Sequence, residues 1–231
     1  MYKIGIVNAT KNSMEPINDV LETKESLVTA QHFSDFELLS DIREAGGVKK
    51  PFIRRVIRLL EEAESQQVDG VALSCSSFTP YVDLLRSLFD FPIVSVDYDM
   101  LEKSVEVGTK IGVISTLPTA GKTTKSIIES IATKQNKNVE IYSEIVDQAG
   151  KAILNGQEEE HNRLIIETII ELSAKCDVIV LAQLSMCRVL RQKVELQNDI
   201  PILTSADFCI SSLINTLGRK EEGLGCSILS V

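Results

Sequence analysis

The sequence predicts an α/β protein of two similar lobes, and two observations lead to this prediction. Short apolar runs alternate with segments in which apolar residues recur every three or four positions, an order typical of a parallel sheet with helices on both faces. The same order of elements returns at an offset of 107 to 109 residues, which indicates an internal duplication. We therefore expect two mostly parallel sheets, each flanked by helices, in lobes related by a pseudo-twofold axis.

The first half of the chain contains four expected strands and four expected helices. Continuous apolar runs mark the strands, whereas the helix after Pro51 shows apolar residues at helical spacing from Phe52 to Leu60. The expected strands cover residues 2–7, 27–33, 71–73 and 93–96, and the expected helices cover 14–21, 51–66, 79–89 and a segment from about 100.

Three segments of the first half have counterparts in the second. Residues 3–7 correspond to 110–114, 68–73 to 176–181, and 91–94 to 200–203. We accordingly expect an N-terminal lobe at 1–104, a C-terminal lobe at 105–212, and a tail at 213–231 that packs back on the first lobe. Sites in such folds lie at the carboxyl ends of the strands, so two facing lobes would enclose a ligand.

Cys75 follows the most apolar strand of the first half. Thr79 is a plausible N-cap and Pro80 suits the first position of a helix, where its missing N–H costs nothing. A thiol beside a helix N-terminus is favoured as a thiolate, and the free N–H groups there bind anions. The alternative is that Cys75 is a small buried apolar residue, as most unpaired cysteines are.

The strand ends of both halves are polar. Aligning the halves places Gln183 at the position of Cys75, and Ser185 at that of Ser77. A pocket lined by one thiol, one amide and neutral hydroxyl donors suits a small carboxylate, although any single hydroxyl here could simply cap a helix. The remaining polar residues at these ends are Asn8, Thr10, Ser76, Thr116 and Thr119.

Two of these segments resemble motifs of the aspartate/glutamate racemase superfamily, which also contains hydantoin racemases, maleate isomerases and arylmalonate decarboxylases. Leu73-Ser-Cys-Ser-Ser77 stands where the family has a Cys-Asn-Thr type of motif, and the segment 178–185, VIVLAQLS, stands where it has a second Cys-Thr motif. The resemblance covers most of the chain. It implies an enzyme without metal or organic cofactor, a homodimer, whose two cysteines face each other across a small carboxylate substrate.

The sequence departs from this family at the second cysteine. Gln183 stands there, and its amide cannot transfer a proton at neutral pH. The segment 181–186, LAQLSM, resembles a branch of the family in which the second cysteine is replaced by glutamine. Cys187, four residues after Gln183, is not expected to reach the same point. The predicted catalytic positions are Cys75 and Gln183, and the predicted substrate-binding residues are Asn8, Thr10, Ser76, Ser77, Thr116, Thr119 and Ser185.

One thiol leaves several functions open. The leading hypothesis is a racemase or isomerase that acts at the carbon beside a carboxylate, with Cys75 as acid–base or nucleophilic group. An oxyanion would be held by Ser77, Ser185, Thr116 and backbone N–H groups. The alternatives are a decarboxylase of a malonate-like acid with Cys75 as proton donor, and a small-carboxylate binding protein without catalysis.

Composition narrows the class of protein further. A net charge of −9 argues against nucleic acid as a partner, and neither a signal peptide nor an apolar run of membrane-spanning length is apparent. The five cysteines are widely spaced, which favours neither a disulfide framework nor a metal site and predicts a reducing cytoplasm.

Three further features of the sequence are not expected to take part in catalysis or nucleotide binding, or have only a weak link to the site. The run 119–124, TAGKTT, resembles a phosphate-binding loop, but that motif needs a glycine at 116 and the residue is Thr116. His161 lies among carboxylates and is expected to be solvated, as are the basic residues around Arg55. His32 ends the second strand and could lie near the site.

Overall fold

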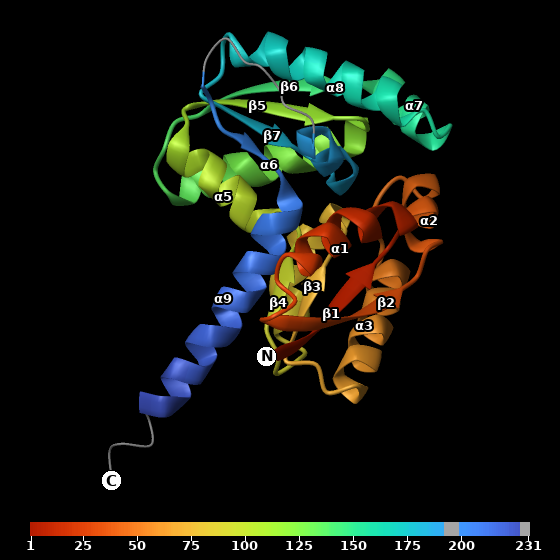
Figure 1. Cartoon of the computed structure of the whole chain (residues 1–231), viewed down its shortest axis with the longest axis vertical. Helices are drawn as coiled ribbons and strands as arrows, with labels where there is room; N and C mark the ends of the chain where they lie inside the picture. The colour runs from red at the N-terminus through yellow and green to blue at the C-terminus, as the bar shows by residue number, and fades with distance from the viewer. Residues whose placement is uncertain (192–198, 227–231) are drawn as a thin grey trace. The chain divides into compact units, whose positions relative to one another are not determined.

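The computed structural model describes residues 1–191 and 199–226, which form two compact units (Figure 1). The first unit contains Met1–Val96 and the described residues from Ala206 onward, and the second contains Asp97–Ser205. These bounds differ from those of the predicted lobes for two reasons. Helix α5 (Tyr98–Val107) packs against α6 (Pro118–Lys134) of the second unit, and α9 (Ser205–Cys226) places Leu213 beside Gly70 in the first.

The first unit is built on a four-stranded parallel sheet in the order β2-β1-β3-β4. Its strands are β1 (Tyr2–Asn8), β2 (Val28–Ser34), β3 (Gly70–Leu73) and β4 (Ile93–Ser95). Besides α9, its helical segments are the 3₁₀ turns η1 (Lys11–Ser13) and η2 (Ser76–Tyr81) and the helices α1 (Met14–Glu22), α2 (Leu38–Glu44), α3 (Lys50–Ser65) and α4 (Val82–Arg86).

The second unit repeats this plan with a parallel sheet in the order β6-β5-β7-β8. The strands are β5 (Lys110–Ser115), β6 (Glu140–Ile145), β7 (Val178–Leu181) and β8 (Ile202–Leu203). With α5 and α6, the unit contains α7 (Asp147–Leu154), α8 (Glu158–Ser173) and the 3₁₀ segment η3 (Leu184–Arg191). The predicted α/β fold with two similar sheets is confirmed.

Equivalent backbone contacts in the two units make the duplication visible at the level of atoms. Asp69 accepts a hydrogen bond from the backbone N–H of Lys3 at 2.7 Å, and Asp177 accepts one from that of Lys110 at 2.8 Å. Beyond the central strands, the N–H of Ser74 donates to the Val7 carbonyl and that of Ala182 to the Ile114 carbonyl. Both units therefore bring the same two strand ends together.

Each central strand is covered on both faces. Every residue of β3 and of β7 is buried, as expected for parallel strands between two helical layers. In the first unit β3 packs in a core with α3, and in the second β7 packs with α8. Among the described residues, no helix is long and apolar enough to cross a bilayer.

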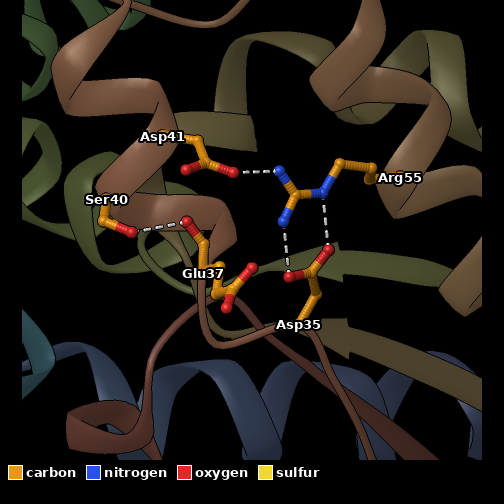
Figure 2. Close-up of polar contacts among 5 residues, drawn as sticks. All are labelled: Asp35, Glu37, Ser40, Asp41 and Arg55. Atoms are coloured by element: carbon orange, nitrogen blue, oxygen red, sulfur yellow. Dashed lines mark hydrogen bonds and ion pairs between the residues drawn. The ribbon is translucent and has the colours of Figure 1, made fainter.

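An ion-pair cluster holds the loop that follows β2 (Figure 2). Arg55 of α3 donates to both carboxylate oxygens of Asp35 at 2.6 Å and also pairs with Asp41 of α2. The pairing lowers the pKa of Asp35 and raises that of Arg55. Arg54 and Arg58 are exposed as expected, but the solvated position expected for Arg55 is wrong.

Replacing Arg55 by lysine should lower the free energy of unfolding by about 1–2 kcal/mol, because lysine cannot donate to Asp35 with two parallel hydrogen bonds. Urea denaturation followed by circular dichroism measures this. The matched control is Arg58→Lys on the exposed side of α3, which should change stability by less than about 0.5 kcal/mol. Equal losses in the two variants would contradict a structural role of the cluster.

His161 is part of the core of the second unit. Its side chain is fully buried because α7 packs over the first turn of α8, and its Nδ1 lies 2.9 Å from the Ala149 carbonyl oxygen. A carbonyl only accepts, so Nδ1 carries the proton; among the described residues, Nε2 has no hydrogen-bond partner. Burial lowers the pKa of His161, and the expectation of a solvated side chain is wrong.

The buried histidine should make stability depend on pH near neutrality. Its unfolded-state pKa is about 6.5, and the folded value is lower, so the unfolded state takes up the proton first. The stabilisation is complete above about pH 6.5 and is lost as pH falls, at up to about 1.4 kcal/mol per pH unit for one group. Urea titrations between pH 7.5 and 5.5 measure the slope.

The variant His161→Asn keeps a donor for the Ala149 carbonyl oxygen but does not titrate. It should show a shallower fall in the free energy of unfolding over the same pH range. The chain has one other histidine, His32, whose contribution remains in the variant. A slope identical to that of the wild type would mean that His161 does not control the acid response.

Candidate functional site

Each unit presents a polar cluster at the carboxyl ends of its two central strands. We call Asn8, Ser13, His32, Ser74 and Cys75 the first-unit cluster, and Thr116 with Gln183 the second-unit cluster. Ligands of parallel α/β sheets bind at these strand ends, because the chain there leaves the sheet with free backbone N–H groups and side chains.

Cys75 follows Ser74 in the two-residue connection between β3 and η2 and is half-buried. Its carbonyl oxygen accepts the N–H of Phe78 at 3.1 Å, which begins the 3₁₀ turn at Ser76. The prediction that Thr79 caps a helix beginning at Pro80 is wrong: both residues lie inside η2, and Thr79 is buried. The helical turn thus starts immediately after the cysteine, and the first N–H groups of such a turn, those of Ser76 and Ser77, have no partner within it.

Asn8 ends β1 and is fully buried. Its Nδ2 lies 3.2 Å from the Ile6 carbonyl oxygen, 3.0 Å from His32 Nδ1 and 3.2 Å from Ser34 Oγ. Its Oδ1 lies 3.0 Å from Ser74 Oγ. Asn8 therefore connects the ends of β1, β2 and β3, and this predicted site residue lies next to the residue that precedes Cys75.

Two hydroxyls complete the first-unit cluster. Ser13 Oγ lies 3.0 Å from Ser74 Oγ and 3.3 Å from Asn8 Oδ1, and it also contacts the Thr10 carbonyl oxygen at 2.8 Å. Ser13 and Ser74 were not among the predicted site residues, and His32 was noted only as a residue that could lie near the site. The signal that could have identified His32 and Ser74 is the strand register, which pairs Ile6 with His32 and Val7 with Leu73.

His32 is half-buried and links β2 to α1. Its Nε2 lies 2.9 Å from Asn18 Oδ1, and its other ring nitrogen faces Asn8. Desolvation by burial lowers the pKa of His32, so the imidazole is neutral at pH 7.

In the second-unit cluster, Gln183 occupies the same backbone position as Cys75. It follows β7, and its carbonyl oxygen accepts the N–H of Met186 at 3.0 Å, as that of Cys75 accepts Phe78. Its side-chain Oε1 lies 2.6 Å from the Thr116 backbone nitrogen and 3.0 Å from Thr116 Oγ1. A backbone N–H can only donate, so this contact identifies the amide oxygen without ambiguity.

The Gln183 amide nitrogen consequently points away from Thr116. It makes no hydrogen bond with any residue that the structure describes, and the side chain is half-buried. The second-unit cluster therefore presents a fixed donor of two hydrogens where the first-unit cluster presents a thiol. This arrangement can bind an oxyanion or a carboxylate, but it cannot move a proton at neutral pH.

Two glycines permit close packing around Ser115 and Thr116. A Cβ on Gly150 of α7 would lie 3.0 Å from the Thr116 carbonyl oxygen, and one on Gly121 of α6 would lie 2.6 Å from Ser115 Oγ. Gly121 belongs to the run that resembles a phosphate-binding loop, and close contact between α6 and β5 accounts for this glycine.

The other predicted site residues are less closely tied to the clusters. Thr10 contributes its carbonyl oxygen to Ser13, and Thr119 is exposed in the first turn of α6. Ser185 is half-buried in η3, where its carbonyl oxygen accepts Arg188 Nε at 3.0 Å. Among the described residues, no group of three His, Cys, Asp or Glu side chains could hold a metal ion.

Comparison with solved structures places this fold among racemases. A glutamate racemase from Bacillus anthracis is similar over 95% of this chain and 82% of its own, with a TM-score of 0.71 and 16% identity. An aspartate racemase from Picrophilus torridus (94% and 95% covered, TM-score 0.69, 13% identity) and an allantoin racemase from Klebsiella pneumoniae (95% and 89% covered, TM-score 0.68, 12% identity) have the same fold.

The sequence comparison gives a consistent result. No curated protein is significantly similar in sequence. The profile of the Asp/Glu/hydantoin racemase family, however, matches residues 4–213, a range that includes both sheets, Cys75 and Gln183. The chain therefore belongs to the Asp/Glu/hydantoin racemase family.

Proposed function

We propose that the protein is a cofactor-independent racemase or isomerase that acts at the carbon beside a carboxylate, with Cys75 as its single site thiol. The family and the fold support a racemase-type function. The observation that carries the finer proposal is the equivalence of Cys75 and Gln183, which follow β3 and β7 at the same backbone position. One acid–base group and one neutral donor replace a symmetric pair of thiols.

Cys75 supplies the proton chemistry in this proposal. As a thiolate, it removes the proton from the carbon beside the carboxylate, and the bonding electron pair moves into the carboxylate to give an enediolate. Return of a proton to the opposite face, from water or another side chain, inverts the centre, and the thiol gives up its proton to solvent. The N–H groups of Ser76 and Ser77, which have no partner within η2, favour the thiolate.

Gln183 stabilises the negative charge that develops. Its oxygen is held by two donors of Thr116, so its NH₂ group is oriented before substrate binds. A preorganised donor aimed at a developing oxyanion contributes more than one that must reorient during the reaction. The proposal accordingly assigns Gln183 to charge stabilisation and Cys75 to proton transfer.

Decarboxylation of a malonate-like acid is the second candidate, favoured by the presence of Gln183 where a second thiol would stand. Loss of CO₂ leaves the electron pair of the broken C–C bond on the carbon beside the remaining carboxylate. The Cys75 thiol then donates one proton to that carbon and is restored from solvent. This reaction needs one proton donor, whereas racemisation needs a proton on each face.

Exchange with solvent deuterium tests the enzymatic proposal. A panel of amino acids, hydantoins and dicarboxylates is incubated in D₂O and followed by ¹H NMR, with malonates monitored for CO₂ release. At least one acid should exchange beside its carboxylate or lose CO₂, and Cys75→Ala should lower that rate by about 10²- to 10⁴-fold, the usual contribution of a positioned acid–base group.

The matched control is Cys187→Ala, another half-buried cysteine that lies in η3, and it should keep the wild-type rate. Tight binding of an acid without exchange or decarboxylation would favour a binding protein. Exchange that survives in Cys75→Ala would remove Cys75 from the mechanism.

Substituting Gln183→Glu tests its role as a donor. A glutamate oxygen can still accept both hydrogen bonds of Thr116, but the second oxygen places an acceptor and a charge where the NH₂ group was. The concentration of carboxylate that protects Cys75 from iodoacetamide should rise about 10- to 100-fold, the effect of one lost hydrogen bond and an unpaired charge. Gln157→Glu, the same change at an exposed position of the second unit, should leave protection unchanged. Equal protection in Gln183→Glu and wild type would contradict the assignment.

A further inference from the structure

We propose that His32 is a positioning residue of the first-unit cluster. In its neutral Nε2–H tautomer it holds the Asn8 amide in one orientation and, through Asn8, fixes the hydroxyl of Ser74, the residue before Cys75, and that of Ser13. His32 acts through Asn8 and not on the substrate. The catalytic consequence rests on the function proposed above, whereas the tautomer and its effect on the thiol do not.

The orientation of the Asn8 amide follows from two contacts. Its nitrogen lies 3.2 Å from the carbonyl oxygen of Ile6, which can only accept, so the atom facing it must be the NH₂ group. The amide oxygen then faces Ser74 Oγ at 3.0 Å. Because the side chain is fully buried, a reversed amide would place two acceptors together at Ile6 without water to compensate.

The tautomer of His32 follows from the orientation of Asn8. The Asn8 NH₂ group lies 3.0 Å from His32 Nδ1, and a proton on Nδ1 would place two donors against each other at this distance, so Nδ1 is unprotonated. The proton is therefore on Nε2, where it faces Asn18 Oδ1 at 2.9 Å. Within the part of the chain that the structure describes, the imidazole contacts these two amides by hydrogen bonding, one on β1 and one on α1, and neither titrates.

Asn8 transmits this orientation to the residue before the cysteine. Ser74 carries one hydroxyl proton and has three acceptors at 3.0 Å: the Val7 carbonyl oxygen, Asn8 Oδ1 and Ser13 Oγ. Its backbone N–H also donates to Val7. Cys75 follows in the chain, so the direction in which the thiol leaves the sheet depends on this arrangement.

The second unit shows that the fold does not need a pair like Asn8 and His32. The internal offset of 107 residues places Ser115 at the position of Asn8, and strand pairing places Ser143 where the first unit has His32. Among the residues that the structure describes, Ser115 Oγ has no hydrogen-bond partner. The same sheet thus forms without a bridged amide in the unit that has Gln183, and the bridge is found in the unit that has the thiol.

Two substitutions distinguish the roles of the two ring nitrogens of His32. Asparagine places its oxygen close to the position of Nδ1, so His32→Asn keeps an acceptor for Asn8. Glutamine places its amide close to the position of Nε2, so His32→Gln keeps the contact with Asn18 and loses the acceptor for Asn8. Both are neutral amides of similar polarity, and they differ in which end of the imidazole they replace.

The tautomer is measured by long-range ¹H–¹⁵N NMR of the imidazoles, which is feasible because the chain has two histidines and His161→Asn assigns the spectrum. The thiol is measured by the rate of Cys75 alkylation with iodoacetamide at pH 7, read by peptide mass spectrometry. We expect the Nε2–H form of His32 in the wild type and in Asn18→Ala. His32→Gln should alkylate about threefold more slowly, as for a rise of half a unit in the thiol pKa, and His32→Asn should stay near the wild-type rate.

An Nδ1–H tautomer of His32, or equal alkylation rates in His32→Asn and His32→Gln at equal thermal stability, would overturn the proposal. Neither readout needs a substrate, so absence of turnover with every acid tested would refute the enzymatic function without deciding the role of His32. Where an exchanging acid is found, the two variants should rank in the same order by kcat.

Discussion

The register of the two central strand pairs determines which side chains meet at the carboxyl ends of the sheets. In the first unit Val7 pairs with Leu73, and in the second Ile114 pairs with Leu181. The residues that follow these pairs are the ones that interact: Asn8 with Ser74, and Thr116 with Gln183. A slip of one residue would turn alternate side chains to the other face of the sheet. β3 and β7 pack in a core on both faces, so such a slip would disrupt that packing together with the clusters. The core and the clusters thus depend on the same register.

The two units have the same sheet but different polar side chains after their central strands. Where the first unit has a serine and a cysteine after its central strand, the second has Ala182 and Gln183. In the first unit a buried amide from β1 organises hydroxyls; in the second, a backbone N–H and a hydroxyl organise an amide. Both arrangements fix the direction of a side chain before any ligand arrives, which is the form in which polar groups are most effective at a site. The two units therefore share a backbone arrangement and differ in a few polar residues at the strand ends.

The sequence was sufficient to predict the fold but not the burial and the partners of individual side chains. Apolar runs and their repetition predict the succession of strands and helices along the chain and its duplication, because the burial of both sheet faces imposes that pattern. The acidic first turn of α8 suggests solvent around His161, yet α7 covers it, a tertiary contact that composition does not record. The same reasoning misplaced Arg55, whose carboxylate partners lie 14 and 20 residues away in sequence. Cys75 was predicted to follow the third strand, and it lies two residues after the end of β3. The turn beginning at Ser76 was not predicted, since Pro80 is a stronger local signal than a 3₁₀ hydrogen bond.

The order of the two units along the chain has a consequence for biosynthesis. The chain leaves the first unit at Val96 and rejoins it at Ala206, so the second unit is an insertion in the sequence of the first. Helix α9, whose Leu213 packs beside Gly70, leaves the ribosome only after the whole of the second unit. Domains generally fold as they emerge, and here the unit that starts first must wait for its last helix. Strand β3, which precedes Cys75, is thus translated early, and α9 packs beside it late. During that interval the second unit can fold around a complete sheet of its own.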